Sequence, residues 1–215
     1  MATVAKRRAL HADGVWVFEG VGWKEYSGFL KAFEERPGYR LIYDQGTLEI
    51  MSPSLRHDHP GRLLGRMVVV LTEQFELPIK SGGSTTLRRR LKKRGVEADE
   101  CFWIENAHRM KGRLDLNLRR DPPPDLAIEI DLTHSSLDSM AIYAALRVPE
   151  LWRVQGDIMQ FFVLQENGKY KQVERSKAFP QITPTDLMRF VVRIHQEGDE
   201  NPIIRDFRKW VRGLK

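Results

Sequence analysis

The sequence has one cysteine and lacks the long apolar runs of membrane proteins. Cys101 alone excludes an intramolecular disulfide and any zinc site that needs several cysteines. No apolar run approaches the roughly 20 residues that cross a bilayer. The basic residues near the N-terminus are not followed by the apolar stretch of a secretory signal. We therefore expect a soluble, cytoplasmic protein that has no membrane partner.

Common catalytic signatures are absent as well. The glycine-rich stretch at residues 81–84 has neither the lysine nor the following helix of a phosphate-binding loop. No nucleophilic serine elbow is present. His57 and His59 flank Asp58, but without the His-x-x-x-His spacing of a helical zinc site they do not predict zinc. The acidic and basic residues are therefore the informative features.

The composition is that of a globular protein with a basic surplus. Of 215 residues, 41% are hydrophobic and 30% are charged, which excludes a disordered chain and permits a sizeable core. Lysine and arginine number 35 against 29 aspartates and glutamates, so the formal net charge is +6 and the isoelectric point is near 9.5. Such a surplus favours polyanionic partners, nucleic acid first among them. A basic protein-interaction module would have the same composition, but it would not bind DNA in a salt-sensitive manner.

The hydrophobic pattern predicts one domain with an α/β or α+β fold, in which helices pack against a mixed sheet. We expect a basic N-terminal arm at residues 1–19, the domain itself at 20–200 and a C-terminal tail at 201–215. Strands are predicted at 39–43, 47–51, 85–91, 96–104, 125–130, 150–155, 158–164 and 169–174. Helices are predicted at 22–36, from Pro60 to Pro78 with Asp58 as the N-cap, and at 136–147 and 184–197.

Acidic residues on two of these strands point to a metal site. Glu97 and Asp99 fall on one face of a predicted strand, and Glu129 lies within an apolar run. An unpaired buried carboxylate is costly and usually has a cation partner. If the two strands are neighbours, Asp99 and Glu129 converge and offer the oxygen ligands that Mg²⁺ prefers, at a site able to hydrolyse phosphodiesters. In the alternative, Glu97 and Asp99 end an exposed strand and Glu129 pairs with a core arginine.

A basic run directly precedes the first acidic strand. It places six positive charges within seven positions, at Arg88, Arg89, Arg90, Lys92, Lys93 and Arg94. Such a run can hold a nucleic-acid backbone beside the metal, although it carries no sequence specificity. The alternative is a solvated loop between two strands.

Four stretches carry motifs in a fixed order. They are YRLIYDQGTLEIMSPSLRH (39–57), VEADECFWI (96–104), PPDLAIEIDLT (123–133) and SLDSMAIYAALRVPELW (136–152). In this order and spacing the chain resembles the Uma2 family of putative restriction endonucleases, bacterial proteins of the PD-(D/E)XK nuclease superfamily, over about residues 20–195. The resemblance implies a restriction-endonuclease-like mixed sheet flanked by helices, with the site at the bend between two central strands. It also implies a metal-dependent DNA endonuclease, for which a homodimer would suit double-strand cutting.

The resemblance implies roles for individual residues. Asp99 corresponds to the metal-binding aspartate of the PD element, with Ala98 in place of the proline, and Glu129 corresponds to the acidic residue of the (D/E)XK element. These two would hold Mg²⁺ or Mn²⁺, with Glu97 or Asp131 as a possible further ligand.

Two further residues are expected to support the metal ligands without binding the ion. They are Glu49, in the β-hairpin predicted for residues 39–51, and His57, at the entrance of the following helix. For His57, helix capping or loop packing is an equally good interpretation. Asp131 is a third candidate for this supporting role.

One position departs from the family pattern. The lysine expected two positions after Glu129 is Asp131, and where the family has a lysine in the next helix this chain has Ser139. The lysine orients the attacking water and stabilises charge on the phosphate, and losing such a group typically costs about 10²–10³ in rate. Arg147 is a possible substitute cation. The alternative to an endonuclease is therefore a catalytically weakened or inactive nuclease-fold protein that binds nucleic acid.

Overall fold

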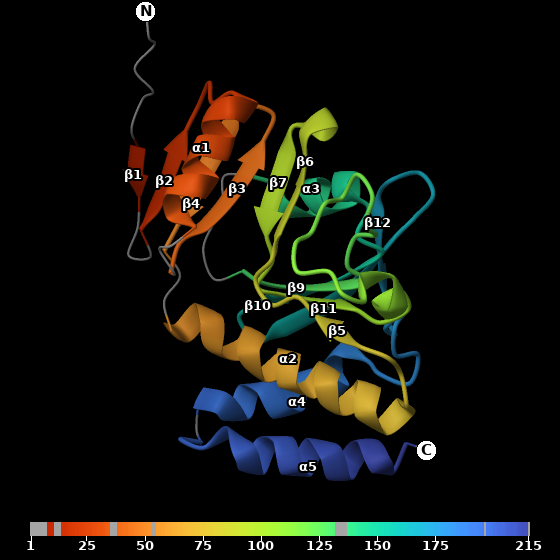
Figure 1. Ribbon diagram of the computed structural model, residues 1–215. Coiled ribbons are helices and arrows are strands. Elements are labelled where there is room, and N and C mark those ends of the chain that lie inside the picture. Colours follow the sequence, from red (N-terminus) through yellow and green to blue (C-terminus); the bar gives the residue numbers. More distant parts are fainter. Residues whose placement is uncertain are drawn as a thin grey trace, which may run out of the picture.

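Two sheets form the framework of the computed structural model, which describes residues 8–10, 14–34, 38–52, 55–131, 137–195 and 197–214 (Figure 1). The first sheet contains β1 (Arg8–Leu10), β2 (Val15–Phe18), β3 (Arg40–Asp44), β4 (Thr47–Met51), β6 (Thr86–Arg89) and β7 (Arg94–Glu97). Its strand order is β1-β2-β4-β3-β7-β6, and its neighbouring strands are antiparallel.

The second sheet is mixed. It contains β5 (Lys80–Ser81), β8 (Glu100–Trp103), β9 (Leu126–Ile130), β10 (Glu150–Gln155), β11 (Ile158–Leu164) and β12 (Tyr170–Val173). The order is β12-β11-β10-β9-β8-β5, with β9 and β10 parallel and the other neighbours antiparallel. The expected α+β fold of restriction-endonuclease-like type is confirmed, with two sheets where one was predicted.

Helices cover both sheets. They are α1 (Trp23–Phe33), α2 (Leu55–Phe75), α3 (Ser139–Leu146), α4 (Pro184–Val191) and α5 (Glu200–Arg212), with short 3₁₀ turns η1 (Arg90–Lys92), η2 (Ala107–Met110) and η3 (Val192–His195). In Figure 1, α1 lies on the first sheet, while α2, α4 and α5 form a layer beside the second. A core cluster joins this layer to β8–β11, and a second cluster joins α3 to β7, β8, β9 and β10. No helix in the described ranges is long and apolar enough to cross a membrane.

The most consequential difference from the expected elements is at residues 96–104. One strand is predicted there, but β7 ends at Glu97 and β8 begins at Glu100, and the two strands belong to different sheets. β7 pairs with β3 and β6, whereas β8 pairs with β5 and β9. The chain therefore passes from one sheet to the other at Ala98 and Asp99. Local strand propensity cannot predict this, because it does not indicate which strands pair with each other.

The predicted start of the second helix was wrong, and both terminal segments contain regular structure. α2 begins at Leu55 and carries Pro60 inside it, where a start near that proline was predicted. The expected N-terminal arm contains β2, which pairs with β4 along its whole length. The expected tail at 201–215 contains α5, whose apolar side chains are buried against α2: Ile203, Ile204, Phe207 and Val211. Tertiary packing extends each of these elements beyond what local signals indicate.

Tyr26 and Tyr43 stack between α1 and β3, with ring centroids 4.5 Å apart. Both side chains are buried, but their hydroxyl groups differ. The Tyr43 hydroxyl donates to Val21 O at 2.9 Å, whereas the Tyr26 hydroxyl has no hydrogen-bond partner within the described part of the chain. The Tyr26 hydroxyl lies close to Gly95, where an added Cβ would be 2.1 Å from its oxygen.

The substitution Tyr26→Phe is therefore expected to raise the free energy of unfolding by about 1 kcal/mol, because it removes a buried polar group that lacks a partner. Tyr43→Phe makes the same chemical change and is expected to lower it by about 1 kcal/mol, since a buried hydrogen bond is lost. Urea denaturation measures both values. Equal effects of the two substitutions would contradict the distinction between the hydroxyl groups.

Candidate active site

Acidic side chains gather where the two sheets meet. β8 and β9 are antiparallel neighbours, with Glu100 opposite Ile128. Asp99 precedes β8, and its Oδ2 accepts a hydrogen bond from Ile130 N at 2.6 Å. This bond holds Asp99 beside the end of β9, next to Glu129. The predicted neighbour relationship of the two acidic strands is therefore present in the fold.

Glu129 is the most perturbed carboxyl group of this cluster. Burial raises its pKa to about 8, and the charge of Asp99 adds to the rise. The Tyr143 hydroxyl donates to Glu129 Oε2 at 2.7 Å and opposes the rise, as does the positive charge of Arg40. Two carboxyl groups that disfavour each other's ionisation favour a cation between them.

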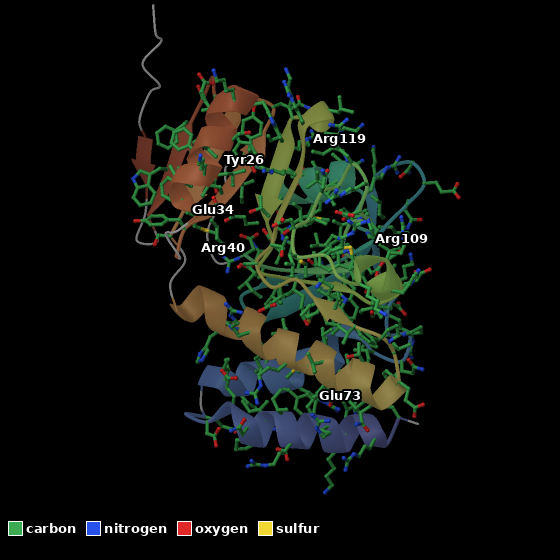
Figure 2. The ribbon with its side chains drawn as sticks, in the orientation of Figure 1. Tyr26, Glu34, Arg40, Glu73, Arg109 and Arg119 are labelled. Atoms are coloured by element: carbon green, nitrogen blue, oxygen red, sulfur yellow. The ribbon has the colours of Figure 1, made fainter. Side chains whose placement is uncertain are left out.

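Arg40 is a site residue that the sequence reasoning missed. It begins β3, and its Nη1 lies 2.9 Å from Asp99 Oδ1 and donates to Ala98 O at 3.0 Å. Its side chain is only 11% exposed, at the end of the first sheet nearest the second (Figure 2). A core arginine was expected, as an alternative, to pair with Glu129, but the direct ion pair is to Asp99. The available signal was an arginine at the head of an apolar strand.

A second arginine–carboxylate pair flanks Asp99. Glu100 is buried, and its Oε1 accepts a hydrogen bond from Arg62 Nη1 of α2 at 3.1 Å. Burial raises the pKa of Glu100, and the Arg62 charge lowers it. α2 approaches closely at Gly65, where an added Cβ would lie 3.3 Å from Glu100 Cδ. Neither Glu100 nor Arg62 was proposed from the sequence.

The two candidate further ligands have other partners. Glu97 accepts hydrogen bonds from Leu41 N at 3.1 Å and from Thr86 Oγ1 at 3.0 Å, which hold it against β3 and β6. Burial raises its pKa. Asp131 forms an ion pair with Arg153 of β10. In the parallel register, Arg153 lies directly opposite Glu129.

Ser139 lies on the face of α3 that approaches Glu129. It is the first residue of the helix and precedes Tyr143 by four positions, so the two side chains share one face. Tyr143 contacts Glu129 directly, which places position 139 one helical turn away. Arg147 is exposed at the opposite end of the helix, in the left-handed conformation at its C-cap. The expected substitute cation is therefore not beside Ser139.

Of the two residues expected to support the metal ligands, Glu49 and His57, the structure describes the side chain of Glu49. Glu49 is buried on β4, opposite Ile42 of β3. The side chain of His57 lies outside the described residues, so its supporting role stays a prediction.

The basic run divides into two groups. Arg89 donates to Leu118 O at 2.8 Å, and Arg94 donates to Asp44 Oδ1 at 2.7 Å. The other four cations are exposed around η1: Arg88, Arg90, Lys92 and Lys93.

The carboxylate ligands available here suit Mg²⁺ better than a metal ion that is coordinated entirely by protein side chains. Among the residues that the structure describes, no group of three or more His, Cys, Asp or Glu side chains is arranged to hold a metal. Mg²⁺ needs only one or two carboxylates and keeps several waters. Asp99 and Glu129 supply such a pair, and the raised pKa of Glu129 beside Asp99 indicates that a cation there would be favourable.

This pKa shift predicts a pH dependence of stability. The folded state holds the Glu129 proton up to about pH 8, whereas the unfolded chain releases it near the ordinary glutamate value. The stabilisation is therefore complete at low pH and is lost as the pH rises through this window. We expect the melting temperature to fall between pH 5 and pH 8, and Glu129→Gln to reduce the slope. An unchanged slope in that variant would contradict the assigned pKa.

A comparison with models of protein families matches residues 23–195 with Uma2, described as a putative restriction endonuclease. The matched region runs from α1 to η3 and contains Asp99, Glu129, Arg40 and Tyr143. No curated protein matches the sequence.

Proposed function

Because the chain belongs to the Uma2 family of putative restriction endonucleases, we propose that it is a metal-dependent endonuclease that hydrolyses phosphodiester bonds in DNA. The observation that carries the proposal is the convergence of Asp99 and Glu129 at the passage between the sheets, within the matched region. We further propose a cytoplasmic location and a homodimer, in which each subunit cuts one strand.

The chain's own residues would orient the reacting groups. Ile130 N–H fixes the Asp99 carboxylate and the Tyr143 hydroxyl fixes that of Glu129, so that both are pre-positioned as ligands. Mg²⁺ or Mn²⁺ held by these two carboxylates would lower the pKa of a bound water and neutralise charge on the scissile phosphate. Glu97 is omitted from the proposed ligands because its hydrogen bonds from Leu41 N and Thr86 Oγ1 hold it on the first sheet, between β3 and β6.

A second candidate function is nucleic-acid binding without cleavage. Ser139 favours it, because a hydroxyl at the position of the family's lysine supplies no positive charge to the phosphate. Arg40 does supply a positive charge at Asp99, but its side chain is largely buried and already forms an ion pair with that carboxylate.

Incubation of supercoiled plasmid with Mg²⁺, Mn²⁺ or EDTA tests the proposal. Nicked and linear products are expected with either metal and not with EDTA. A folded protein that retards DNA in a gel but leaves the plasmid intact with both metals would instead support the binding function.

A further inference from the structure

The hairpin of β6, η1 and β7 ends in an exposed leucine surrounded by cations. Leu91 is 88% exposed, and it lies among Arg88, Arg90, Lys92 and Lys93, all of which are exposed as well. We refer to these five residues as the hairpin tip. An isolated surface leucine needs no explanation, but here it is combined with four unburied positive charges on a single projection.

Backbone and side-chain bonds fix the shape of this hairpin. Lys93 N donates to Arg90 O at 3.0 Å, and Lys93 O accepts from Gln45 N at 2.9 Å. At its base, Leu87 and Val96 are fully buried. Arg89 and Arg94 bond to Leu118 and Asp44, as described above. The tip is therefore a pre-formed projection, which would lose little conformational freedom on binding.

The surroundings extend the positive surface. The bond from Arg89 to Leu118 brings the 111–120 loop against the hairpin. Arg119 of this loop is exposed, and Figure 2 shows it beside the hairpin tip. Asp44, at the end of the neighbouring strand β3, forms an ion pair with Arg94.

From these observations we propose that the hairpin tip enters the major groove of double-stranded DNA, with Leu91 against the base edges and the cations on the flanking phosphates. The inference rests on the proposed function. A two-stranded ribbon fits the major groove of B-form DNA, where apolar side chains contact the thymine methyl group. Arginine and lysine on either side reach the phosphates that border the groove.

The fold also sets the distance between this contact and the carboxylates. Leu91 and Asp99 are eight positions apart, which even a fully extended chain spans in at most about 27 Å. At roughly 3.4 Å per base pair, the bases touched by Leu91 lie within about eight base pairs of the phosphate at Asp99 and Glu129. The tip and the carboxylates would therefore contact one short duplex segment.

Binding measurements without cleavage test the proposal. Fluorescence anisotropy in EDTA, with a 24-base-pair duplex and the corresponding single strand, gives the dissociation constant over a range of salt concentrations. Leu91→Ser is expected to weaken duplex binding about tenfold with an unchanged salt slope, because only apolar contact is lost. Ile158→Ser is the matched control, since Ile158 is 65% exposed but lies on β11 of the second sheet, and it should have no effect.

The charge contribution is tested separately. The double substitution Arg90→Gln and Lys92→Gln is expected to reduce the salt slope for the duplex by about two, one unit for each phosphate contact. The control pair, Arg205→Gln and Lys209→Gln, removes two exposed cations from α5, at the opposite end of the molecule from η1 (Figure 1). It should leave the slope unchanged.

Two results would overturn the inference. One is equal weakening of single-stranded and duplex binding by Leu91→Ser, which would exclude groove insertion. The other is that the hairpin variants bind the duplex as tightly as the wild-type protein and still cut plasmid. This result would refute the groove contact but leave the proposed endonuclease function intact. If the wild-type protein does not cut plasmid but its duplex binding depends on the hairpin tip, the proposed endonuclease function is refuted and the hairpin contact is supported.

Discussion

Replacing Glu129 by alanine is expected to abolish metal-dependent cleavage, with a loss of at least about 10³-fold in the rate of plasmid nicking. Glu129 and Asp99 are the two carboxyl groups that the fold brings together beside the ends of β8 and β9. Metal binding at such a site stabilises the developing charge by several kcal/mol, and each 1.4 kcal/mol corresponds to a factor of about ten in rate. A single remaining carboxylate would hold the ion too weakly to supply this stabilisation.

Two further variants make this measurement specific. Glu129→Gln keeps the shape of the side chain and an oxygen able to accept the Tyr143 hydrogen bond, but it removes the charge that the metal needs. At pH 8 this variant should fold at least as stably as the wild type, because burial disfavours ionisation of the native glutamate. Glu105→Gln changes an exposed glutamate beyond β8 and should leave cleavage unchanged. Normal cleavage by Glu129→Ala would refute the site.

The reverse change is expected from Ser139→Lys, which should raise the cleavage rate by about 10²–10³-fold. Ser139 and Tyr143 occupy one face of α3, and the Tyr143 hydroxyl touches Glu129. A lysine at position 139 can extend along this face and place its ammonium group near the carboxylate pair. The added charge would stabilise the phosphate and orient the attacking water. Initial rates of plasmid nicking at saturating Mg²⁺ provide the comparison.

Ser139→Gln is the matched control for chain length without charge, and it should cleave at the wild-type rate. Combining Ser139→Lys with Glu129→Ala should eliminate the gain, since the lysine acts only at a loaded site. If Ser139→Lys gives no gain in a protein that binds DNA, the missing lysine does not limit the rate. A non-catalytic role, or a different cation such as Arg40, would then be favoured.

Several parts of the fold could be predicted from local sequence. The two apolar runs on either side of Asp44-Gln45-Gly46 predicted the hairpin of β3 and β4, and these strands pair antiparallel. The apolar residues of α2 recur at three- and four-residue spacing from Leu63 to Leu71, as expected for one face of a helix, and they are buried. The apolar run at residues 126–130 predicted the buried strand β9. In each case the signal lies within a few consecutive residues, because burial repeats with the period of the element.

The sequence by itself also determined the family and the two acidic positions, since ordered motifs fix residue types at set intervals. Only the tertiary structure decided what surrounds them. It split residues 96–104 between two sheets at Asp99, brought Arg40 to that carboxylate from 59 positions away, and placed Tyr143 on Glu129. The raised pKa of Glu129 follows from these long-range contacts. Burial and charge act through space, so a pattern along the chain cannot report them.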